Sequence, residues 1–114
     1  MGRILTIRVQ AVTFSPEEVR RQWPKLWGVA FERHRPVFPC PHQGVLELVQ
    51  AVDDARHFGS VEKEEALVLA QGMPAVLAAR RSLERALSDW DVRGAVAATD
   101  TLEDALDYVE QQMP

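Results

Sequence analysis

The sequence predicts an α+β domain that is mostly helical. Three observations point to this class: the first residues alternate between apolar and polar side chains, the second half carries apolar residues at helical spacing, and a proline-rich segment separates the two patterns. We therefore expect an N-terminal β-strand followed by an antiparallel bundle of about four helices connected by short links.

One domain over residues 1–114 accounts for the length of the chain. Within it we expect a strand–helix unit at residues 1–33, a proline-rich connector at residues 34–43 and a helical bundle at residues 44–114. Hydrophobic residues make up 46% of the sequence and charged residues 26%, a balance typical of soluble globular domains.

The alternating pattern at the N-terminus is typical of a half-buried strand. Leu5, Ile7 and Val9 fall on one face, whereas Thr6 and Arg8 fall on the other. A lone strand leaves its backbone donors and acceptors unpaired, so this one must find a partner. The partner would be a second strand of this chain in a small two-stranded sheet, the same strand of a second copy in an intermolecular sheet, or a strand of another protein.

Helix signals follow directly after the strand. Ser15 is a good N-cap, Pro16 suits the first helical position, and Glu18 completes a capping box. Pro24 interrupts the helical pattern because it lacks a backbone donor and disfavours helix at the residue before it. Residues 26–32 then either continue the helix or form a second strand, and the spacing favours the helix.

Apolar stripes mark the helices of the bundle. A helix over residues 44–58 is expected to end at Gly59, and the next helix begins after Ser60 and breaks or bends at residues 71–74. The stripe of the first of these helices contains Val45, Leu48, Val49 and Val52. The helix after Pro74 has a face formed by Val76, Arg80, Leu83, Leu87 and Trp90. The stripe of the last helix contains Val92, Val96, Thr99, Leu102, Leu106 and Val109.

Charge and cysteine content exclude several classes of protein. The formal net charge is −4 and the basic residues form no long run, which argues against a nucleic-acid partner. A single cysteine cannot form an internal disulfide, so a reducing, cytoplasmic location fits best. No apolar run approaches the length of a membrane span, so we expect no membrane partner.

The segment HRPVFPCPH, residues 34–42, is the first candidate for a metal site, with His57 as a fourth ligand. Asp54 and His57 also share a helix surface, where a surface ion pair is the favoured interpretation. His34, Cys40 and His42 are residue types that bind zinc, but their spacing matches no common zinc pattern. The prolines favour an extended backbone, from which neighbouring side chains diverge. We therefore interpret the segment as a stiff connector and expect no cofactor. A metal-binding or thiol-dependent protein that uses these three residues is the alternative.

No residues assemble into a pattern that defines a reaction, so we predict no catalytic residues. The favoured interpretation is a non-catalytic protein–protein interaction or assembly module, which forms a homodimer through the N-terminal strand or binds another protein. Tryptophan is enriched at interface hot spots. The predicted interaction surface consists of Leu5, Ile7, Val9, Trp23 and Trp27.

The last helix is strongly acidic. A solvated face opposite the apolar stripe is the favoured interpretation, and a docking face for a basic partner is the alternative. The acidic residues are Asp100, Glu103, Asp104, Asp107 and Glu110.

Overall fold

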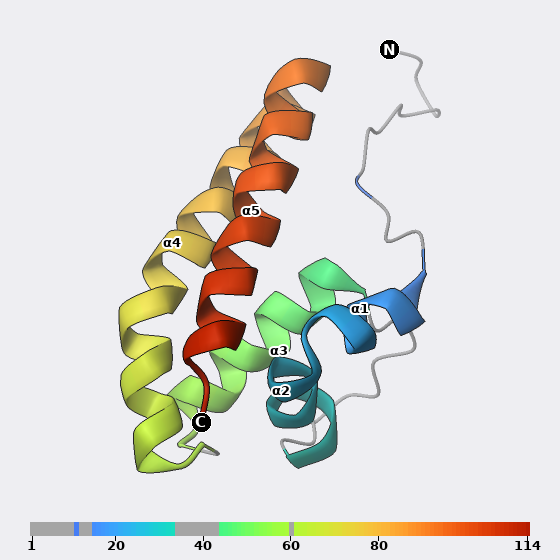
Figure 1. The fold of residues 1–114 in the computed structure, drawn as a ribbon. Helices are drawn as coiled ribbons and strands as arrows, with labels where there is room; N and C mark the ends of the chain where they lie inside the picture. Colours follow the sequence, from blue (N-terminus) through green and yellow to red (C-terminus); the bar gives the residue numbers. More distant parts are fainter. Residues whose placement is uncertain (1–10, 12–14, 34–43, 60) are drawn as a thin grey trace, which may run out of the picture.

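Over the residues that it describes, the protein is all-helical (Figure 1). The computed structural model describes residues 11, 15–33, 44–59 and 61–114. Its elements are α1 (Pro16–Gln22), α2 (Pro24–Trp27), the π-helix η1 (Gly28–Arg33), α3 (Val45–His57), α4 (Lys63–Ser88) and α5 (Val92–Gln112).

The predicted α+β class is therefore wrong. The candidate second strand at residues 26–32 is helical, and every element in the described ranges is a helix. The physical reason is that Leu26, Val29 and Ala30 bury one face at helical spacing and are fully shielded from solvent. The predicted N-terminal strand, with Leu5, Ile7 and Val9, lies outside the described residues.

Helices α4 and α5 form a long antiparallel hairpin, and α1, α2 and α3 pack against the part of it nearest the C-terminus (Figure 1). The end of the hairpin that carries the α4–α5 turn projects beyond these shorter helices. Close packing of the two long helices requires a glycine, because a Cβ atom at Gly72 would overlap the side chain of Val109.

Helix α4 runs without interruption through Pro74, so of the two outcomes expected at residues 71–74, a break or a bend, the break does not occur. Leu69, Met73 and Val76 lie on either side of the proline and are completely buried. This burial outweighs the local cost of the missing backbone donor, because tertiary packing supplies most of the stability of a helix in a protein. The helix begins after Glu62. The carboxylate of Glu62 accepts from the backbone N–H of Glu65, and the carboxylate of Glu65 accepts from the backbone N–H of Glu62, which forms a capping box.

Proline has the predicted effect in the N-terminal helices. Helix α1 begins at Pro16 with Ser15 as its N-cap, as expected, and Pro24 ends it and starts α2. The expected capping box is absent, because the Ser15 side chain makes no capping hydrogen bond and Glu18 instead pairs with Arg21 at 2.9 Å.

A single core joins all these helices. Trp23 and Trp27 from the N-terminal helices contribute to it, and Trp27 meets the ring of Phe31 edge-on with 4.7 Å between ring centroids. In α3, Leu48, Val49 and Val52 are buried. None of the described helices combines the length and the apolar character that crossing a membrane requires.

Candidate binding groove

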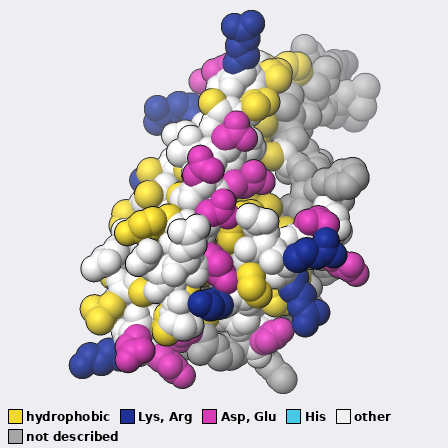
Figure 2. All heavy atoms as spheres, in the orientation of Figure 1, with side chains coloured by type: hydrophobic (Ala, Val, Ile, Leu, Met, Phe, Trp, Pro, Cys, Tyr) yellow, Lys and Arg dark blue, Asp and Glu magenta, His cyan; other side chains and the backbone are white. Residues whose placement is uncertain are grey.

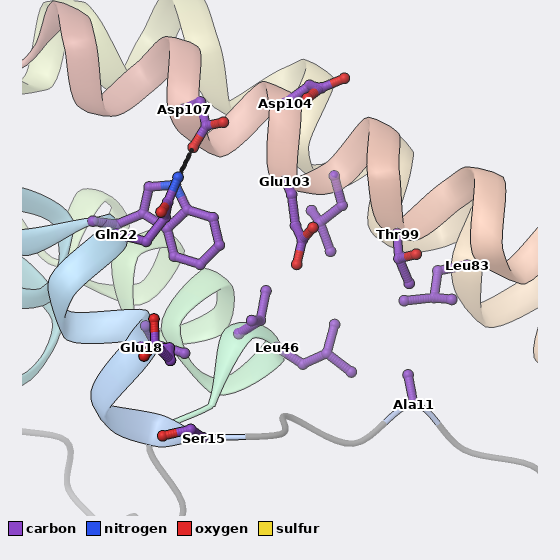
Figure 3. Close-up of a pocket in the computed structure, with 14 residues that line it drawn as sticks. Ala11, Ser15, Glu18, Gln22, Leu46, Leu83, Thr99, Glu103, Asp104 and Asp107 are labelled. Carbon is purple, nitrogen blue, oxygen red and sulfur yellow. Dashed lines mark hydrogen bonds between the residues drawn. The ribbon is translucent and has the colours of Figure 1, made fainter.

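A cavity of about 580 Å³ opens between α1, α3 and the α4–α5 hairpin (Figure 3). Apolar side chains from three helices form its floor, among them Val19, Leu46 and Leu102. Ala11, on the N-terminal side of α1, lies at one end of it. We call this cavity the acidic groove. Its described lining residues are Ala11, Ser15, Glu18, Val19, Gln22, Trp23, Val45, Leu46, Leu83, Thr99, Leu102, Glu103, Asp104 and Asp107.

Every charged side chain among the described lining residues is a carboxylate. Glu18 comes from α1, and Glu103, Asp104 and Asp107 come from α5. Glu103 extends toward the middle of the groove (Figure 3), and acidic side chains run along this face of the molecule (Figure 2). Among the described residues, neither Glu103 nor Asp104 forms an ion pair. The groove therefore combines an apolar floor with negative charge that has no counter-charge from the described lining.

The pKa of Glu103 is raised above its ordinary value of 4.5. Partial burial is the main cause, because it removes water from the charged form. Repulsion from Asp100, Asp107 and Asp104 adds to the shift. A cation placed beside Glu103 would oppose both effects, so the groove favours a basic group.

Asp107 and Glu110 connect α5 to the N-terminal helices. Asp107 accepts hydrogen bonds from the Trp23 indole at 2.8 Å and from the Gln22 amide at 3.1 Å. The Glu110 carboxylate accepts from the backbone N–H groups of Lys25 at 2.7 Å and Leu26 at 3.0 Å, and thereby caps the start of α2. The acidic face of α5 is thus only partly solvated, because these two residues bind another part of the chain.

The projecting end of the hairpin carries exposed apolar side chains. We call Leu87, Trp90, Val92 and Val96 the hairpin-end patch. Trp90 is 58% exposed, Val92 70% and Val96 56%, whereas Leu87 is partly buried against the core. All four residues belong to the predicted apolar stripes. A smaller cavity of about 250 Å³ lies among them.

The backbone at Trp90 has an unusual conformation. Its φ angle is 58°, in the left-handed region that costs an L-residue roughly 1–2 kcal/mol. The N–H of Trp90 bonds to Leu87 O at 3.2 Å and that of Asp91 bonds to Ala86 O at 2.8 Å. This is a Schellman ending of α4, with tryptophan where glycine is usual.

Some of the site residues predicted from the sequence are placed by the structure, and others lie outside the residues that it describes. The structure places Trp23 and Trp27 in the core, at 3% and 8% exposure, and Trp23 also lines the acidic groove. Leu5, Ile7 and Val9, and likewise His34, Cys40 and His42, lie outside the described residues.

Sequence reasoning identified the acidic helix but not the groove. The run of carboxylates in the sequence indicated an acidic helix. It did not indicate which of these carboxylates bond to α1 and α2 and which face an open cavity. No group of three or more histidine, cysteine or acidic side chains within the described ranges is arranged to hold a metal ion. His57 is an exposed residue whose Nδ1 lies 2.8 Å from Asp53 O.

Comparison with known proteins gives no relative for this chain. A scan against protein-family models, a search of curated proteins and a search of solved structures all find no match.

Proposed function

We propose that this protein is a non-catalytic protein–protein interaction module that binds a basic, amphipathic segment of a partner in the acidic groove. The supporting observation is that the described charged side chains of the groove are all carboxylates above an apolar floor. Glu103 and Asp104 are solvent-exposed, so arginine or lysine from a partner adds modestly to affinity and acts mainly by steering association and selecting basic partners.

The proposed partner contributes two kinds of contact. Apolar side chains of the partner cover Val45 and Leu46, the partly buried apolar residues of the groove, which supplies affinity by removing apolar surface from water. A guanidinium or ammonium group pairs with Glu103 and Asp104, which supplies specificity and speeds association. A reducing cytoplasm remains the proposed location, because it suits a chain with one cysteine.

Calorimetric titration with synthetic peptides tests this function. The probe is a short peptide that alternates arginine and leucine, and its matched control has glutamate in place of arginine. We expect the arginine peptide to bind and the glutamate peptide not to bind. The variant Glu103→Lys should weaken binding of the arginine peptide at least tenfold, or about 1.4 kcal/mol.

Asp100→Lys is the matched control for Glu103→Lys. It makes the same change of charge on the same helix, but Asp100 does not line the groove. Equal weakening by the two variants would indicate general attraction to the acidic surface and would contradict binding in the groove. Equal binding of the two peptides would contradict the proposed partner chemistry.

Homodimerisation through the predicted N-terminal strand, with Leu5, Ile7 and Val9, stays a prediction. Light scattering coupled to size exclusion measures the mass of the chain in solution, and a mass that stays at one chain over a range of concentrations would contradict it.

A further inference from the structure

The hairpin-end patch is an apolar surface with little free charge among its described residues. Asp91 is the one charged residue in the described lining of its cavity, and its carboxylate already accepts from the N–H of Gly94 at 2.9 Å. At about 250 Å³ the cavity is smaller than the roughly 300–1,000 Å³ of small-molecule sites, so it suits a single side chain of a partner. Three large apolar side chains exposed around one cavity indicate a contact surface.

The backbone of Trp90 gives a second, independent reason to regard the patch as a contact surface. Its φ angle of 58° is one that glycine adopts without steric cost and that tryptophan adopts only with strain. Strain of this kind persists mainly where a side chain serves a function. Tryptophan is also among the residues that contribute most to binding energy at interfaces. Trp90 is therefore a candidate anchor for a partner.

The patch continues directly into the acidic groove. Leu83 and Thr99 line both cavities, and they lie at the end of the groove opposite Asp107 (Figure 3). Val96, Thr99 and Glu103 follow one another at helical spacing, so one stripe of α5 runs from the patch into the groove over about 10 Å. The Thr99 hydroxyl donates to Val96 O at 2.6 Å, so it needs no further partner at this junction.

The charged part of the groove leaves room for an apolar anchor. Glu103 and Asp104 are exposed, so ion pairs with them select and steer a basic partner but add little affinity. Burial of apolar surface adds more, and the patch offers exposed apolar side chains at the end of the same groove.

We propose that one partner segment occupies both surfaces, with its basic part against Glu103 and Asp104 and an aromatic or large aliphatic side chain in the cavity beside Trp90. This inference rests on the proposed function, and it adds the second half of the partner. The apolar anchor lies about 10 Å from the cationic group, a distance that about three residues of extended chain cover.

Calorimetric titration of the full-length chain with extended peptides tests the proposal. The probe is the arginine peptide with a tail of about three glycine and serine residues that ends in phenylalanine, attached at either end in turn. In the control peptide the tail ends in serine. We expect the phenylalanine peptide, in the better of its two orders, to bind at least tenfold more tightly than its control. Trp23 and Trp27 are buried and the peptides contain no tryptophan, so a blue shift of emission on binding reports on Trp90.

Two variants probe the patch itself. Trp90→Gly should abolish the gain from phenylalanine and should fold, because glycine adopts a φ of 58° without steric cost. Its matched control is Phe58→Gly, at an exposed aromatic residue that follows α3 and lines neither cavity, and this variant should keep the gain. Val96→Ser, at a residue that is 56% exposed, should reduce the gain without disturbing the described core.

Three results would overturn the proposal. Equal affinity of the phenylalanine and serine tails would leave the patch to another segment of this chain or to a second copy. A gain that survives Trp90→Gly would place the anchor elsewhere. A mass of two chains in solution that falls to one in Val96→Ser would assign the patch to a second copy.

Failure of this inference is distinguishable from failure of the proposed function. Equal affinity of the two tails, with the arginine peptide still bound, contradicts this inference alone. An arginine peptide that does not bind at all contradicts the proposed function.

Discussion

At the scale of single residues, Gly72 and Gly28 have opposite surroundings. A Cβ at Gly72 would overlap Val109, which is fully buried and stiff because it is β-branched. A Cβ at Gly28 would have its nearest neighbour at 3.9 Å, on the side chain of Glu32. The same substitution at the two positions should therefore have different effects on stability.

We predict that Gly72→Ala lowers the melting temperature, because overpacking costs about 1–3 kcal/mol and the better helix propensity of alanine returns at most about 1 kcal/mol. Gly28→Ala should leave the temperature unchanged or raise it, because alanine restricts the unfolded chain by about 0.4–1 kcal/mol. Thermal unfolding followed by circular dichroism measures both. An increase in Gly72→Ala would show that α4 and α5 are less closely packed at this point.

The raised pKa of Glu103 predicts a dependence of stability on pH. Because the folded protein holds this proton more tightly than the unfolded chain, stability falls as pH rises from 4.5, the ordinary value, through the raised pKa. Asp100, Asp104 and Asp107 on α5 repel the charged form of Glu103, and the carboxylate of Glu18 lines the groove from α1.

We predict that Glu103→Gln stabilises the protein at pH 7 and loses this advantage below pH 4.5, where Glu103 is protonated in both states. Urea unfolding at the two pH values measures the difference. Glu17→Gln, an exposed carboxylate on α1 outside the groove, is the control and should change little. A stabilisation of equal size at both pH values would rule out ionisation of Glu103 as the cause.

At the scale of elements, α2 depends on a carboxylate from a different helix. Removal of the Glu110 side chain leaves the N–H groups of Lys25 and Leu26 without their acceptors. We predict that Glu110→Ala lowers the free energy of unfolding by about 1–3 kcal/mol, the cost of unsatisfied donors in a partly buried position. The amides of Lys25 and Leu26 should also exchange faster with solvent.

Gln111→Ala is the control for Glu110→Ala, because Gln111 is the exposed neighbour on the same helix turn. Urea unfolding and amide exchange by NMR compare the two variants. If both variants lose the same stability, the effect belongs to the C-terminal turn of α5 and not to the cap of α2.

Most element boundaries could be predicted from local signals. Proline and serine marked the start of α1, and the apolar spacing of Leu48, Val49 and Val52 marked α3. The uninterrupted course of α4 through Pro74 could not be predicted, because it depends on burial contributed by other helices. The fold class was wrong because one alternating segment, which lies outside the described residues, carried the whole β prediction.

The binding groove was less predictable than the helices. Whether Glu103 faces an open cavity while Asp107 bonds to Trp23 depends on the rotation of α5 against α1, which no local pattern encodes. The exposure of Val92 and Val96 could not be predicted from the sequence for a similar reason. Their spacing continues the apolar stripe of α5, but the shorter helices that cover this stripe end before they reach the projecting part of the hairpin.

At the scale of the whole molecule, the N-terminal helices and the α4–α5 hairpin form two parts that should open separately. We predict that Asp107→Ala, which removes the acceptor of the Trp23 indole, speeds amide exchange in α1 and α2 by about tenfold, or about 1.4 kcal/mol. Amides in the middle of α4 should change much less, because the contacts of α4 with α5 remain.

Asp104→Ala is the matched control for Asp107→Ala. Asp104 lies on the same helix and lines the same groove, but has no ion-pair partner among the described residues. Equal acceleration of exchange in α4 and in α1 after Asp107→Ala would show that the protein opens as one cooperative unit.

The hydrogen bonds from α5 to the N-terminal helices also set an order of events during synthesis on the ribosome. Trp23 and Leu26 bond to acceptors that lie 84 residues further along the chain. At roughly 5–20 residues per second, these acceptors are made about 4–17 s after the groups that need them. During that interval the Trp23 indole and the first amides of α2 have only water or a chaperone to bind. A translation product that ends before Asp107 would leave them in that state permanently, as a substrate for cellular proteases.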